Sequence, residues 1–162
     1  MEKTMYNYIT RLIPFAFLAV FQFAQASDES PVYTRVMEDA AYDEALTMVK
    51  DVIKGKGINI AHTLPAGEML GRTGPDFGIK DQVLKSGEIV EFCSASISHK
   101  LIKANPENIT ICPFSIAVYV LNSDPANVRL TTRIPYVLDG SSSEAQEMRE
   151  FVQGIVDEVA DW

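Results

Sequence analysis

Basic residues are scarce in this chain, which has 14 lysine and arginine residues against 22 aspartate and glutamate residues and a formal net charge of −8. Nucleic acids and anionic lipid surfaces both attract clustered lysine and arginine side chains. We therefore expect neither of them to be a main partner. The acidity says little more about function, because a net charge of either sign also keeps a domain soluble.

Cysteine and histidine are also rare, with two residues of each. The cysteines form no Cys-x-x-Cys motif, so a thioredoxin-like activity is not expected. Five residues separate Cys93 from His99, and this spacing matches no standard zinc or copper pattern. Cys93, Cys112, His99 and His62 are the candidate ligand or redox residues, but we interpret His99 as a solvated helix residue and His62 as a polar residue at a strand end. The sequence thus predicts no bound metal and no cofactor.

The apolar run at the amino terminus is too short to cross a membrane. It extends from Leu12 to Ala24, about 13 residues, whereas a spanning helix needs about 20. Lys3 and Arg11 precede it, and Ala24-Gln25-Ala26 follows the spacing of small residues that a signal peptidase cleaves. We predict a signal peptide over residues 1–26, cleaved after Ala26, and a periplasmic or secreted protein with no membrane attachment after cleavage. An uncleaved anchor is the alternative.

For the chain after the signal peptide, we predict a polar tether over residues 27–31 and one α+β domain over residues 32–162. Periodicity predicts three helices, at 42–53, 97–104 and 148–162. Runs rich in β-branched residues, or alternating in polarity, predict strands at 32–37, 58–63, 88–94, 109–121 and 128–134. Residues 65–86 contain several glycines, and we predict a long irregular loop there that borders a site. At most one helical turn, from Glu68 to Arg72, is expected in it.

These elements favour a particular fold class. The strands outnumber the helices and do not alternate strictly with them, which is typical of a mixed, mainly antiparallel sheet with helices packed on one face. The closing helix has an apolar stripe that we expect to dock on the sheet. The stripe consists of Met148, Val152, Ile155, Val159 and Trp162.

Part of the chain resembles a known bacterial family. Several short motifs carry this resemblance, and they are Phe92-Cys93-Ser94-Ala95, Leu101, Pro106, Ile111-Cys112-Pro113-Phe114 and Val118-Tyr119. Their order and spacing match those seen in the domain of unknown function 302 family. Asp43 to Gly57, followed by Ile58-Asn59-Ile60, is similar to the first helix and second strand of that family. Ser94-Ala95 stands where the family usually has Asn-Pro. The resemblance covers roughly residues 32–139 and implies a curved sheet of the TATA-binding-protein-like type, but no established reaction.

Cys93 and Cys112 leave three alternatives open. They could form a disulfide, as an even number of cysteines in an exported protein invites. They could instead be buried, unreactive thiols, or a redox-active or ligand-binding pair. A short connection separates the two strands that carry them, so we predict that the cysteines lie close enough for a bridge.

The sequence shows no recognisable set of catalytic residues. The densest group of carboxylates, Glu38, Asp39, Asp43 and Glu44, surrounds the start of the first predicted helix, where negative charge is favourable. No nucleophile or base accompanies it. The sequence therefore predicts a non-catalytic exported module that binds a small molecule or a partner protein on the sheet face bordered by residues 65–86. The alternatives are a thiol- or metal-linked redox accessory protein using Cys93 and Cys112, and a small enzyme with scattered acid and base groups.

Overall fold

The structure, a computed structural model, describes residues 30–139 and 142–162. The predicted signal peptide lies outside these ranges. Within them, no helix is both long enough and apolar enough to cross a membrane. The strands are β1 (Val32–Met37), β2 (Ile60–Leu64), β3 (Leu84–Phe92), β4 (Phe114–Leu121) and β5 (Asp124–Arg133). The α-helices are α1 (Tyr42–Gly55), α2 (Ala66–Thr73), α3 (Ala95–Ala104) and α4 (Ser142–Ala160), and two short 3₁₀ helices are η1 (Gly74–Phe77) and η2 (Pro106–Ile111).

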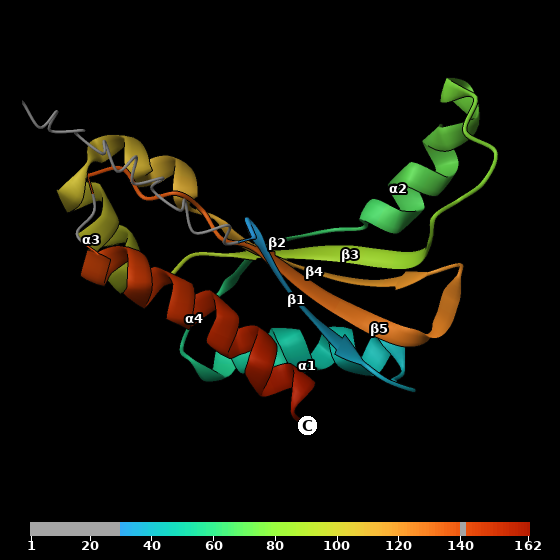
Figure 1. Cartoon of the computed structure of the whole chain (residues 1–162), viewed down its shortest axis with the longest axis horizontal. Coiled ribbons are helices and arrows are strands. Elements are labelled where there is room, and N and C mark those ends of the chain that lie inside the picture. Colours follow the sequence, from blue (N-terminus) through green and yellow to red (C-terminus); the bar gives the residue numbers. More distant parts are fainter. Residues whose placement is uncertain (1–29, 140–141) are drawn as a thin grey trace, which may run out of the picture.

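The five strands form one antiparallel sheet in the order β1-β5-β4-β3-β2 (Figure 1). β1 and β2 are the two edges, and the two longest strands, β3 and β5, flank β4. The strands twist across the sheet, and α1 and α4 lie on one side of it. The predicted α+β class, with an antiparallel sheet and a long carboxyl-terminal helix packed on one face, is thus confirmed.

The hydrophobic core lies between the sheet and helices α1, α3 and α4. Every second residue of β4 is buried there, which is the period-2 pattern of a strand with two different faces. On α4, Met148, Val152, Ile155 and Val159 are all buried, as the apolar stripe predicts. Trp162 was expected to complete that stripe, and this expectation is wrong. The helix ends at Ala160, and Trp162 is 85 % exposed beyond its last turn.

The strand predicted over residues 109–121 begins later than expected. Residues 106–111 form η2, and β4 starts at Phe114, after Pro113. Proline has no N–H to donate to a strand ladder, and it disfavours the helical conformation at the residue before it, here Cys112, which is extended. The apolar character of Ile109 and Ile111 therefore reflects a short helix, in which Ile109 is exposed and Ile111 is buried.

Edge strand β1 is held to α4 by a small polar network. Arg35 donates to Asp157 and to Asp161, with each N···O distance 2.6 Å. The hydroxyl of Tyr33 also donates to Asp157, at 2.6 Å. This hydrogen bond to a carboxylate raises the pKa of Tyr33 above its ordinary value. The network joins the first strand to the last helix, more than a hundred residues apart in the sequence.

Candidate functional site

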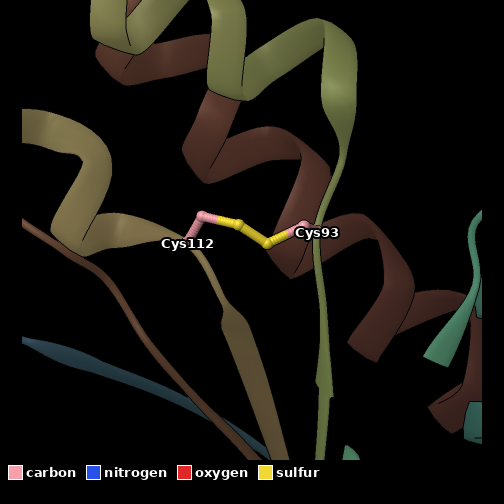
Figure 2. The surroundings of a disulfide bond; sticks show 2 residues. All are labelled: Cys93 and Cys112. Atoms are coloured by element: carbon pink, nitrogen blue, oxygen red, sulfur yellow. A yellow bond between two sulfur atoms is a disulfide. The ribbon is translucent and has the colours of Figure 1, made fainter. Parts of the chain in front are cut away.

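The structure joins Cys93 and Cys112 in a disulfide (Figure 2). Phe92 and Phe114 form the last pair of the antiparallel β3–β4 ladder, and the cysteines lie just beyond it, with their Cα atoms 5.7 Å apart. The predicted proximity of the two cysteines is therefore confirmed. The bridge closes the loop that contains α3 and η2, and it lies beside the packed rings of Phe92, Phe114 and Phe151.

The two histidines are not brought together. His62 lies on edge strand β2 and His99 on α3, and both are exposed. In residues 30–139 and 142–162, no group of three or more histidine, cysteine, aspartate or glutamate residues is arranged to hold a metal ion. Among the carboxylates, Asp43 and Glu44 occupy the first turn of α1. Asp39 accepts no capping hydrogen bond there, because the capping position is Ala41.

The predicted irregular excursion over residues 65–86 contains a complete helix, α2, followed by η1. Helix α2 packs against β3 on the side of the sheet opposite α1 and α4 (Figure 1). This close approach depends on Gly67. A Cβ atom at that position would lie 2.7 Å from the backbone nitrogen of Gly87 and 3.2 Å from its carbonyl oxygen. Glycine thus allows helix and strand backbones to meet where any side chain would separate them.

We call the side of the sheet that carries α2 the open face. Beyond α2, its side chains come from alternate positions of the strands. They are small or polar at Ala117 and Thr131, and Val32 and Val36 of β1 are exposed apolar residues on the same face. Thr131 forms hydrogen bonds with the hydroxyls of Thr34 (2.9 Å) and Tyr119 (3.3 Å). The register places Ala117 beside Ile89 of β3 and Thr131 of β5. The open face is therefore shallow in its middle and walled by α2 at one side.

Two adjoining hollows lie along α2, and we call them together the α2 groove. One, of about 300 Å³, lies between α2 and the open face, and the other, of about 360 Å³, lies between α2, η1 and the start of β3. Leu70 and Leu84 line both. The first is completed by Ala66, Gly87, Glu88, Ile89, Ala117, Val118 and Tyr119. The second is completed by Met69, Thr73, Gly74, Phe77, Ile79, Asp81, Gln82 and Val83.

The α2 groove exposes several large apolar side chains. Leu70 is 47 % exposed and Phe77 is 79 % exposed, and Ile79 and Val83 beside them are also exposed. Contiguous exposed apolar side chains of this kind are typical of binding surfaces. Their grouping depends on the folding of α2 and η1 against β3. From the glycine-rich character of the segment, the sequence predicted that residues 65–86 border a site, but it did not predict that these apolar side chains gather there.

Two other hollows are larger but more polar. One, of about 430 Å³, lies between α1 and the end of α4, and its lining includes Asp51, Lys56 and Glu158, of which the last two form an ion pair. Another, of about 600 Å³, lies near the start of α3 and includes Glu147 and Glu150. Charged linings of this kind remain hydrated, whereas the α2 groove offers an apolar surface that a ligand can cover.

Several polar groups near the α2 groove are engaged in structural interactions, although the buried Nη1 of Arg129 has no hydrogen-bond partner among the described residues. Arg129, beside Tyr119 in the register, donates to Asp124 at 2.6 Å. This hydrogen bond and that of Asn127 hold the pKa of Asp124 below its ordinary value. The described residues around the groove therefore present no acid and base pair with a nucleophile, and the geometry is that of a binding surface.

Replacing Gly67 with alanine is expected to displace α2 from β3, because the added Cβ would overlap backbone atoms that cannot rotate away. We expect a loss of about 1–3 kcal/mol in the stability of this segment, as is usual for overpacking. Hydrogen exchange of the α2 amides should detect it. Gly71→Ala is the matched control in the same helix. Its Cβ would meet nothing closer than 3.8 Å, so that variant should be neutral or slightly more stable. Equal exchange in the two variants would contradict the role of Gly67.

Comparison with known proteins finds a family and a solved structure that match this chain. The family described as "Domain of unknown function DUF302" matches residues 33–159. A crystal structure of an uncharacterised conserved DUF302 protein from Bacillus stearothermophilus has a similar fold, with a TM-score of 0.60 and 16 % sequence identity. The likeness covers 81 % of this chain and 96 % of the other. None of the curated proteins matches the chain.

Proposed function

Because the chain belongs to the DUF302 family, whose description names no reaction, we propose from its own geometry that it is an exported, non-catalytic module that binds an apolar small molecule in the α2 groove. The observation that carries this proposal is the pair of adjoining hollows that share Leu70 and Leu84. Each has the volume of a small ligand site, and both are lined mainly by apolar side chains.

Two features support export. The leader pattern of residues 1–26 is that of a cleaved signal peptide. The Cys93–Cys112 disulfide is the kind of bond that persists in an oxidising compartment. The protein recovered from the periplasm should then begin at Ser27, which an intact-mass measurement determines.

The redox alternative has weaker support. A reactive thiol needs a nearby group that lowers its pKa. Within the described ranges, no hydrogen bond or ion pair joins either sulfur to a histidine, lysine or arginine side chain. The bridge at the ends of β3 and β4 instead has the position of a structural bond.

Binding can be tested with N-phenyl-1-naphthylamine, a neutral apolar dye that fluoresces when it leaves water. We expect saturable binding at one site. Leu70→Glu should weaken it by at least about tenfold, because the new carboxylate would have to be buried beneath the dye. Leu70 is half exposed on a helix, so the variant should still fold.

Ile109→Glu is the matched control, since Ile109 is also an exposed apolar residue but lines neither hollow of the groove. This variant should bind the dye as the wild type does. Dye binding that is equally strong in the Leu70→Glu variant would place the site elsewhere and overturn the proposal, and so would the absence of saturable binding to the wild type.

A further inference from the structure

A polar hollow of about 180 Å³ lies on the open face, at the end where β4 begins and β5 ends. Its lining combines hydroxyl groups with one guanidinium. It consists of Thr110, Ile111, Pro113, Phe114, Ser115, Arg133, Pro135 and Tyr136. None of these residues lines the α2 groove. Pro113 directly follows Cys112, so the disulfide anchors one wall of this hollow.

The polar hollow is the immediate neighbour of the α2 groove. Ser115 and Ala117 point to the same face of β4 because they are two residues apart, which corresponds to about 7 Å along a strand. Ser115 lines the polar hollow and Ala117 lines the groove. Between them the open face carries no bulky side chain on β4. A single elongated ligand can therefore reach from one hollow to the other.

Arg133 is the distinctive group of the polar hollow. The other two arginines of the sheet are each held by carboxylates, Arg35 by Asp157 and Asp161 and Arg129 by Asp124. Arg133 forms no ion pair or side-chain hydrogen bond with any residue in the described ranges, and its side chain is exposed.

Hydroxyl groups complete the donor set. The hydroxyls of Ser115 and Tyr136 make no hydrogen bond with another described residue, so they remain able to donate. A guanidinium with hydroxyls beside it is the arrangement that recognises a carboxylate, through charge-assisted hydrogen bonds.

The surrounding charges make this position selective. The chain as a whole carries a net charge of −8, which repels anions from most of its surface. Glu91 of β3 is on the same face and pairs with Ser115, so it lies on the side of Ser115 away from β5. Two strand spacings, about 10 Å, then separate its backbone from that of Arg133. An anionic group is favourable at Arg133 and unfavourable at Glu91, which fixes where the charged end of a ligand can lie.

We propose that the ligand is a long-chain monocarboxylate, with its apolar chain in the α2 groove and its carboxylate bound by Arg133 and Ser115 in the polar hollow. This inference rests on the proposed apolar binding function and specifies the chemical class of the ligand. Charge complementarity between one unpaired guanidinium and one carboxylate selects the acid over other apolar molecules.

Displacement of bound N-phenyl-1-naphthylamine provides the test, with laurate and dodecanol as competitors at a pH well above the pKa of a carboxylic acid. The two share one apolar chain and differ in the charge of the head group. We expect laurate to compete at a concentration at least about tenfold lower than dodecanol, as a charge-assisted hydrogen bond would provide. In Arg133→Gln this preference should disappear, because laurate weakens while dodecanol is unchanged.

Lys54→Gln is the matched control, since it removes the same charge from an exposed position on α1, on the other side of the sheet. It should keep the full preference for laurate. Equal competition by laurate and dodecanol in the wild type would overturn the carboxylate inference and leave the apolar function intact. Equal loss of preference in the Lys54→Gln and Arg133→Gln variants would overturn the assignment to Arg133. Failure of the dye itself to bind would remove the proposed function.

Discussion

Reduction of the Cys93–Cys112 disulfide is expected to lower the free energy of unfolding by about 3 kcal/mol. The bridge joins residues 19 apart in the sequence, and closing a loop of that length restricts the unfolded chain. In the folded protein the same bond joins the ends of two antiparallel strands, where the chain between them forms α3 and η2. The constraint therefore acts on a segment that local strand pairing does not hold.

Urea denaturation with and without reductant measures this effect. A variant that replaces both cysteines with serine should match the reduced wild type and should not respond to reductant. The double substitution avoids leaving one unpaired thiol that could cross-link two molecules. If the untreated wild type has two titratable thiols and the same midpoint with and without reductant, the cysteines do not stabilise the fold by bridging.

Substitution of Asn108 with leucine is expected to cost about 3 kcal/mol or more. Asn108 is only 2 % exposed, and its side chain makes three hydrogen bonds. Nδ2 donates to the carbonyls of Leu101 (2.9 Å) and Leu138 (2.8 Å), and Oδ1 accepts from the N–H of Leu138 (2.8 Å). These bonds join the end of α3, η2 and the segment that precedes α4. Leucine has a similar volume but would leave both main-chain groups of Leu138 without these partners.

Asn105→Leu is the control, because Asn105 lies three residues earlier and its hydrogen bonds to Glu107 and Asp139 are solvent-exposed. We expect that variant to lose about 1 kcal/mol, the usual cost of a lost cap. Denaturation midpoints of the two variants provide the comparison. Similar losses for both would show that the buried hydrogen bonds of Asn108 contribute no more than the exposed ones.

Local periodicity predicted the elements whose faces differ most in burial. In α4 the apolar stripe from Met148 to Val159 is buried, because one face of a helix meets the sheet. In β5, alternation placed Val128 and Leu130 in the core and left Arg129 and Arg133 on the open face. Periodicity could not place the end of α4. Trp162 continues the stripe in the sequence, but the last turn of the helix lies before it.

Other features depended on contacts that no local pattern contains. The glycines of residues 65–86 indicated irregular structure, yet Gly67 is the residue that lets α2 meet β3. Asn108 stands just before an apolar run in the sequence, and no local pattern predicted that its side chain is buried. The state of Cys93 and Cys112 remained open because it depends on whether β3 and β4 run antiparallel, which is a question of register between separate segments.

The sequence by itself determined a mainly antiparallel α+β fold and the buried stripe of its closing helix, because burial repeats with the period of each element. Only the tertiary structure decided what lies on the open face of the sheet. The α2 groove, Ser115 and Arg133 come together through strand register and through the approach of α2 to β3. Residues far apart in the sequence become neighbours by backbone pairing, and no single segment carries that information.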